Sequence, residues 1–100
     1  MTVFRVLLRM RVRPGSGPAF ERDWRAGATR IATRPASVGQ WLARGTDEEE
    51  VYYVVSDWTD EASFREYERS EAHQQHLRRL RPYRMDGSMS TMDIVVAVTA

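Results

Sequence analysis

The sequence predicts an α+β fold of the ferredoxin-like type, with the element order β-α-β-β-α-β and a second helix that is broken in two. Four segments are predicted to be strands, the first from a clean alternation of apolar and polar residues and the third from an apolar run rich in β-branched and aromatic residues. Two segments with apolar residues at helical spacing lie between them, which favours one antiparallel sheet with helices on a single face. At 100 residues the chain can bury one hydrophobic core, so residues 1–100 are expected to form a single domain.

The first half of the chain predicts a strand, a helix and a second strand. Val3–Arg13 alternates strictly, with one apolar face and one face made mostly of arginine. Pro18 suits the first turn of a helix, which Pro35 brings to an end. The apolar residues that recur within this helix are Phe20, Trp24, Ala28 and Ile31. Ser37–Arg44 is the second strand, and the polar residues 45–50 form a loop of hairpin length.

The second half predicts a strand, a broken helix and a final strand. Val51–Trp58 is rich in the β-branched and aromatic residues that fit a sheet. Thr59 and Asp60 are both suited to cap the following helix, and Ser70 can cap a second one. Residues 85–90 are expected to be a loop. The inward-facing residues of the final strand are then Met92, Ile94, Val96 and Val98.

Aromatic and histidine side chains gather on the third strand and the broken helix. Phe64 and Tyr67, three residues apart, share one helix face. A buried stripe with i, i+3, i+4, i+7 spacing follows, made of His73, His76, Leu77 and Leu80. Trp58 ends the strand beside them. If the protein has a pocket, we expect its wall here.

Each candidate site residue has a chemical interpretation and a structural one. His73 can act as a general base, because imidazole titrates near neutral pH, or it can be a neutral core residue. Trp58 can stack on a flat aromatic substrate or close the core. Tyr67 can donate a hydrogen bond to a phenolic oxygen or pack at an interface. The further candidates for substrate binding are Phe64, Trp41, Trp24, His76, Arg78 and Tyr83.

Several of these further candidates also have a plain structural alternative. Trp24 fits the core of the first helix, and Trp41 can line either the pocket or a dimer seam. Arg78 can hold an anionic oxygen or lie on solvated helix surface. His76 and Tyr83 can be surface or interface residues. The sequence alone leaves these alternatives open.

Composition excludes several classes of function. The absence of cysteine rules out disulfides and thiolate chemistry, and with two histidines in the chain we expect no metal site. The 15 basic residues are all arginine and are interspersed with 14 acids, so no basic block indicates nucleic-acid binding. No signal peptide or bilayer-length apolar run is visible, and we expect a cytoplasmic protein without membrane contact.

The predicted sheet has apolar residues on both faces, which favours a homodimer. Helices cover one face, yet Leu7 and part of the run Val51–Val55 must point to the other. An apolar patch of this kind usually marks an interface. We expect two copies to pack their bare faces together, with arginines such as Arg5 meeting acids such as Asp57 or Asp93.

Residues 56–64, SDWTDEASF, followed by Tyr67, Ser70, Ala72 and His73, resemble the antibiotic biosynthesis monooxygenase domain family. The resemblance implies a dimeric α+β barrel with a pocket between sheet and helices in each subunit. Some members oxidise polycyclic aromatic polyketide intermediates to quinones without metal or flavin. In those enzymes an Asn stands where this chain has Val54 and a Tyr where it has Phe64. Haem-degrading relatives have a His where this chain has Glu68, so the resemblance implies no haem.

The function expected from the residues and the resemblance is that of a small cofactor-independent monooxygenase. It would oxidise a polycyclic aromatic phenol or anthrone to a quinone, with His73 as base, Trp58 orienting the ring and Tyr67 or an arginine holding an oxygen. The alternatives are a polyketide cyclase or accessory protein of the same fold, and a non-catalytic ligand-binding dimer. Oxygen dependence and turnover separate these three.

Overall fold

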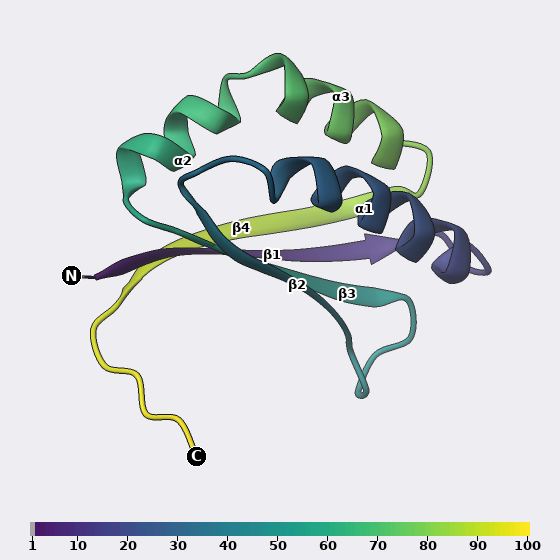
Figure 1. Cartoon of the computed structure of the whole chain (residues 1–100). Coiled ribbons are helices and arrows are strands. Elements are labelled where there is room, and N and C mark those ends of the chain that lie inside the picture. Colours follow the sequence, from purple (N-terminus) through teal and green to yellow (C-terminus); the bar gives the residue numbers. More distant parts are fainter. Residues whose placement is uncertain (1) are drawn as a thin grey trace.

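The computed structural model describes residues 2–100 and has two layers, with three helices above one four-stranded antiparallel sheet (Figure 1). The sheet order is β2-β3-β1-β4. The elements are β1 (Val3–Val12), α1 (Gly17–Ile31), β2 (Ser37–Arg44), β3 (Val51–Trp58), α2 (Glu61–Glu68), α3 (Glu71–Leu80) and β4 (Arg84–Ile94). This arrangement confirms the predicted ferredoxin-like α+β class. Among residues 2–100, every helix is too short or too polar to cross a bilayer.

The second helix is broken in two where the sequence predicts, and a side-chain cap begins each half. The Asp60 carboxylate accepts a hydrogen bond from the backbone N–H of Ser63 at 2.7 Å and begins α2. The Ser70 hydroxyl accepts from the N–H of His73 at 3.2 Å and begins α3, while it donates to the Tyr67 carbonyl at 2.6 Å. Ser70 therefore ties the end of one helix to the start of the next. The break lets α2 and α3 follow the curve of the sheet (Figure 1).

The core between helices and sheet consists of two clusters. One contains Phe20 and Trp24 of α1 and lies over the end of β1 and the beginning of β3, where Met10 pairs with Tyr52. The other contains Trp58 of β3 with Phe64 and Tyr67 of α2. Trp58 and Tyr67 are stacked with their ring centroids 5.0 Å apart, and the Trp58 side chain is only 1% exposed. The strand-end indole thus anchors α2 to the sheet.

The opposite face of the sheet carries no helix (Figure 1). The strand register places Leu7, Val55 and Trp41 side by side in one row across β1, β3 and β2. Beside them the Arg5 guanidinium makes two hydrogen bonds to the buried Asp57 carboxylate, at 2.7 and 2.9 Å. The sequence predicted that Arg5 would meet Asp57 across the interface of two copies, and this is wrong, because the two side chains pair within one chain. We call the row Leu7, Val55 and Trp41, with the Arg5–Asp57 pair, the bare face.

The last strand differs from the prediction. Residues 85–90, expected as a loop, form most of β4, which pairs with β1 as far as Val3 opposite Ile94. Since β1 provides no partner before Val3, the strand ends there, and the predicted inward set of Met92, Ile94, Val96 and Val98 is wrong. Met92 lies opposite Arg5, on the bare side of the sheet. Most of β4 is exposed as an edge strand, so polar residues cost little there and the segment resembles a loop.

Helices α1 and α3 approach closely at Gly27. The imidazole of His76 lies directly over this glycine, and a Cβ built at Gly27 would overlap the ring. A glycine in a helix interior is ordinarily a weak point, by about 0.5–1 kcal/mol relative to alanine. Here the missing side chain provides the space that the His76 ring occupies.

The hairpin between β2 and β3 turns at Glu50, whose φ of +63° is in the left-handed region. No other non-glycine residue within 2–100 has a positive φ. The Glu50 carbonyl accepts a hydrogen bond from the Val12 N–H at 2.8 Å, so its conformation joins the hairpin to the end of β1. The backbone at this position is strained for any residue with a Cβ.

Replacing Gly27 by alanine should destabilise the protein, by about 1–3 kcal/mol, because the new methyl group overlaps the His76 ring. The same change in a His76→Ala background should instead be neutral or stabilising, as expected for glycine to alanine in an ordinary helix. Urea unfolding of the four proteins measures both effects. If Gly27→Ala changed the stability equally in the two backgrounds, overlap with the His76 ring would not be the cause of the destabilisation.

At the hairpin, Glu50→Gly should be more stable than Glu50→Ala by about 1 kcal/mol. Both variants lose the same side chain, so their difference reports the left-handed backbone alone. The matched pair at Glu49, whose φ is not positive, should show no advantage for glycine. Thermal unfolding followed by circular dichroism measures all four variants. An alanine at position 50 that is as stable as glycine would contradict the assignment of strain.

Candidate functional site

A cavity of about 270 Å³ lies between the helix-facing side of the sheet and the three helices. Its volume is slightly below the range of about 300–1,000 Å³ usual for sites of small organic molecules. The lining is mainly apolar and contains residues of both core clusters. Six of the nine predicted site residues contribute to it, namely Trp24, Trp58, Phe64, Tyr67, His73 and His76.

The other three predicted site residues lie outside the cavity. Trp41 is 50% exposed on the bare face, with the Arg5 guanidinium 5.9 Å from its ring centroid. Of the two positions that the sequence left open for Trp41, the pocket wall is therefore wrong. Arg78 bonds to Glu71 at 2.9 Å on the exposed surface of α3.

Tyr83 also contacts the protein itself and does not line the cavity. Its hydroxyl donates a hydrogen bond to the Asp23 carboxylate of α1 at 2.5 Å, and this bond is the main reason why the pKa of Tyr83 is raised. The hydrogen bond between Tyr83 and Asp23 therefore connects the turn after α3 to α1. The alternation and helical spacing gave no signal for this contact, because the two residues are far apart in the chain.

His73 is a half-buried imidazole at the first turn of α3. Its ring meets Tyr67 edge-on at 5.0 Å, and its Nδ1 atom is buried without a hydrogen-bond partner among residues 2–100. Burial lowers the pKa of His73, and the negative charge of Glu68 opposes this shift only in part. The ring is therefore neutral at pH 7 and able to accept a proton.

His76 lies one turn further along α3. Burial, with the nearby charges of His73 and Arg79, lowers its pKa to about 4. Its Nδ1 atom, held against Gly27, also lacks a hydrogen-bond partner in the described part of the chain. Within residues 2–100, no three His, Cys, Asp or Glu side chains are grouped as a metal ion would require. The two imidazoles are thus neutral groups in a mainly apolar wall.

Tyr67 and Trp58 belong to the core and to the cavity wall at the same time. Burial raises the pKa of Tyr67 to about 12, although the Arg34 guanidinium, 5.1 Å above the ring, opposes the shift. The Tyr67 hydroxyl therefore keeps its proton at neutral pH. Trp58 stacks on this ring, and its indole N–H donates to the Ser56 hydroxyl at 3.1 Å. The two interpretations of Trp58, core residue and pocket wall, are compatible.

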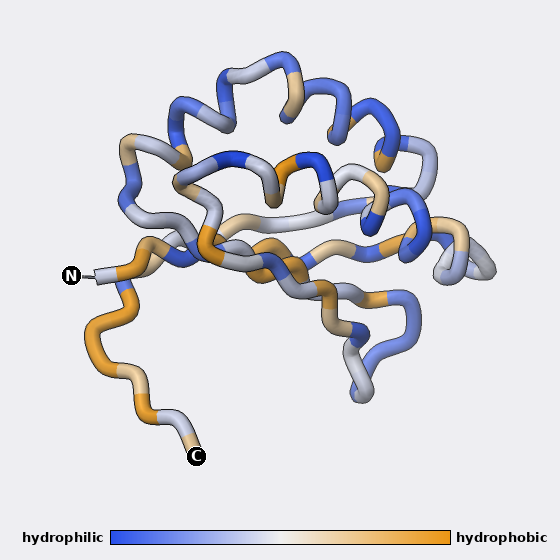
Figure 2. Tube along the Cα trace, in the orientation of Figure 1, coloured by the Kyte–Doolittle hydropathy of each residue, from blue (hydrophilic) through white to orange (hydrophobic). Residues whose placement is uncertain are grey.

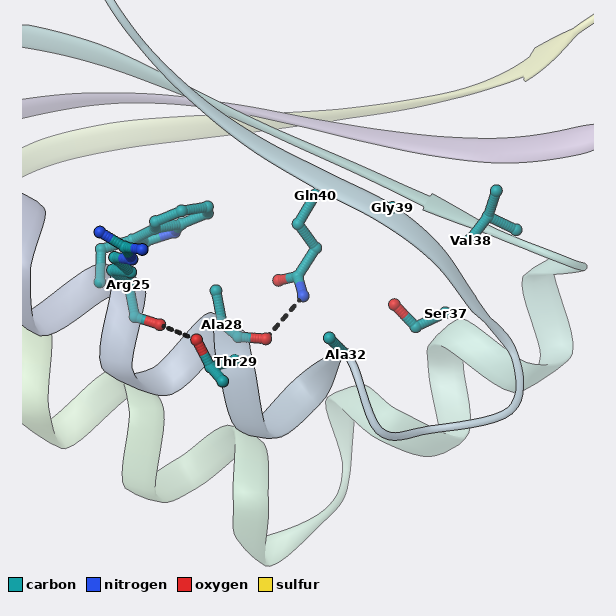
Figure 3. Close-up of a pocket in the computed structure, with 9 residues that line it drawn as sticks. Arg25, Ala28, Thr29, Ala32, Ser37, Val38, Gly39 and Gln40 are labelled. Carbon is teal, nitrogen blue, oxygen red and sulfur yellow. Dashed lines mark hydrogen bonds between the residues drawn. The ribbon is translucent and has the colours of Figure 1, made fainter.

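Sequence reasoning missed two polar residues on the cavity floor, Gln40 of β2 and Ser56 of β3. The alternation of Gln40 with Leu42 on the inward side of β2 was an available signal. Figure 3 shows Gln40 extending from β2 toward α1, where its amide donates to the Ala28 carbonyl at 2.9 Å. There it separates the cavity from an open groove between α1 and β2, which it lines as well.

Val54 and Phe64, at the positions where quinone-forming relatives are expected to carry Asn and Tyr, both line the cavity. That part of the wall is therefore apolar in this protein. The polar groups lie elsewhere. The sheet contributes Gln40, Ser56 and Arg84, and the helices contribute Tyr67, Glu68, His73 and His76. The arrangement can enclose a flat apolar ring and offer it a few hydrogen bonds.

A family model described as antibiotic biosynthesis monooxygenase matches residues 3–79. Solved structures agree with it in fold. A variant of SnoaB, a cofactor-independent oxygenase from Streptomyces nogalater, has a TM-score of 0.86 at 21% identity, covering 98% of both chains. A candidate antibiotic biosynthesis monooxygenase from Caulobacter crescentus has a TM-score of 0.86 at 18% identity, covering 95% of this chain and 92% of that one.

A conserved protein from Methanosarcina mazei has a TM-score of 0.83 at 15% identity and covers 92% of each chain. At these identities the likeness shows a common fold. Among curated proteins, none matches the sequence. The family match extends from β1 into α3 and includes most of the residues that line the cavity. The chain belongs to the antibiotic biosynthesis monooxygenase family.

Proposed function

We propose that the protein is a cofactor-independent monooxygenase that oxidises a flat, hydroxylated polycyclic compound to a quinone. The observation that carries this proposal is the neutral imidazole of His73 in the wall of a mainly apolar cavity. The similarity in fold to SnoaB, which is a cofactor-independent oxygenase, supports the proposal. The cavity volume suits a substrate of two or three fused rings.

The reaction requires a base, a cavity that excludes water, and hydrogen-bond donors that stabilise the substrate anion. His73 removes a proton from the phenol or anthrone, and the resulting anion is electron-rich enough to give one electron to dioxygen. The two radicals combine to a peroxide, which loses water to leave the quinone. For an anthrone the balance is one substrate and one dioxygen to one anthraquinone and one water. Tyr67, protonated at neutral pH, can stabilise the anion while Trp58 orients the ring.

A cyclase acting on a poly-β-ketone chain is the second candidate. The observation that favours it is the apolar wall at Val54 and Phe64, where quinone-forming relatives are expected to hold substrate oxygens. A cyclase needs a shaped cavity and one base, and it is indifferent to oxygen. A non-catalytic ligand-binding dimer is the third candidate, and it would bind an aromatic compound without turnover.

We further propose that two copies form a homodimer through the bare face. Leu7, Val55 and Trp41 form an apolar row that no part of the described chain covers with a helix. The segment after β4 is also apolar and projects beyond the sheet (Figure 2). Its large exposed apolar residues are Val95, Val96 and Val98. Contiguous apolar surface of this kind favours association with a partner.

His73→Gln should lower kcat/KM by about 100-fold or more, because it removes the base and keeps a side chain of similar size. With the native protein, kcat/KM should be constant above pH 6.5 and fall at lower pH as His73 is protonated. Since burial lowers this pKa, the midpoint should lie below 6.5. Oxygen uptake with a reduced anthrone, using metal-free protein, measures both. Quinone formation is followed in parallel.

The matched control is Gln74→Ala, on the exposed surface of α3 next to His73, which should leave the rate unchanged. Oxygen uptake no greater than the background rate would contradict the oxygenase. Product formation that proceeds equally without oxygen would favour the cyclase. If the aromatic compound binds but no product forms with or without oxygen, the result would favour the non-catalytic ligand-binding dimer.

Leu7→Arg and Val55→Arg should convert the dimer to a monomer, because each places a charge in the middle of the apolar row. Size-exclusion chromatography with light scattering gives the mass. The control variant Gln75→Arg adds the same charge on the exposed surface of α3 and should remain dimeric. A native protein that is monomeric at micromolar concentration, or arginine variants that stay dimeric, would contradict this interface.

A further inference from the structure

Gln40 and Ser56 are direct cross-strand partners at the floor of the cavity. Their neighbours on this side of β1 and β3 are apolar, among them Val6 and Val54. We propose that Gln40 and Ser56 together recognise a hydroxyl group of the substrate, a second oxygen besides the one that the base acts on. The inference rests on the proposed function in one respect, which is that the ligand is a hydroxylated flat aromatic.

The hydrogen bonds of Gln40 leave its carbonyl oxygen free. The Ala28 carbonyl can only accept, so the Gln40 atom 2.9 Å from it must be the amide nitrogen. The Oε1 atom and one N–H therefore have no partner within residues 2–100. The bond to Ala28 also fixes the side chain between β2 and α1 (Figure 3). The acceptor is thus held in place before a ligand arrives.

Ser56 provides the complementary donor. Its oxygen accepts the indole N–H of Trp58 at 3.1 Å, and Trp58 is almost fully buried. Because the Ser56 oxygen already accepts this bond, its O–H group is free to donate to another atom. No acceptor for it lies within hydrogen-bond distance in the described part of the chain. The Ser56 hydroxyl is half-buried in the cavity wall and has its donor free, so a ligand oxygen placed there can accept a hydrogen bond from it.

A phenolic hydroxyl matches the pair, because it both donates and accepts. It can donate to Gln40 Oε1 and accept from the Ser56 O–H, whereas an unsubstituted ring carbon can do neither. His73 lies on α3 and the pair on the sheet, so the two sites contact the ligand from different layers of the fold. The substrate class is therefore a flat aromatic compound with at least two oxygen substituents.

The test compares 2,6-dihydroxynaphthalene, which presents a hydroxyl at either end, with naphthalene, which has the same rings without oxygen. Isothermal titration without oxygen measures binding to the native protein, Ser56→Ala and Gln40→Leu. Each variant should weaken binding of the diol about 3- to 10-fold, the value of one hydrogen bond, and change binding of naphthalene less than 2-fold. The controls Ser88→Ala and Gln74→Leu, both on exposed surface, should change neither.

Equal weakening of both compounds, or of neither, would overturn the inference, as would native protein that does not prefer the diol or binds neither compound. If Gln40→Leu does not fold because it lacks the bond to Ala28, the titration of Ser56→Ala with the two compounds tests the inference by itself. Because the titration needs no turnover, its failure is distinct from failure of the oxygenase. Diol-specific weakening without oxygen uptake would retain the hydroxyl site and discard the oxygenase.

Discussion

The antiparallel pairing of β1 with β3 is the constraint on which the rest of the structure depends. Opposite pairs such as Leu8 and Val54 fix which side chains of both strands meet the helices. A register of β3 shifted by one residue would turn Ser56 and Trp58 to the bare face and Asp57 under the helices, away from Arg5. The cavity, the core and the bare face therefore have a common origin in one strand register.

The cavity lies between the two apolar clusters. Residues of both clusters line it, and specific contacts position the helices above it. Ser70 breaks the second helix, and Gly27 admits the ring of His76 between α1 and α3. These contacts place imidazole groups over a sheet floor that is mainly apolar, with polar side chains at Gln40, Ser56 and Arg84.

Burial favours the neutral forms of three side chains in this cavity, His73, His76 and Tyr67. It lowers the pKa of His73 and His76 and raises that of Tyr67. A site with this property leaves a neutral base able to take a proton and a neutral phenol able to donate a hydrogen bond. An anion formed on a bound ring would be held by such donors and shielded from water, which is the electrostatic condition that the proposed oxidation requires.

The sequence by itself determined what depends on neighbours in the chain. Alternation identified the first strand, and the β-branched and aromatic composition identified the third. The caps at Asp60 and Ser70 identified the broken helix, and helical spacing brought His73 and His76 to one face. Only the tertiary structure decided what depends on partners far away in sequence. It set the limits of β4, the exposed position of Trp41 and the pairing of Gln40 with Ser56. Side-chain periodicity is local, whereas strand ends and cross-strand pairs depend on the register of a neighbouring strand.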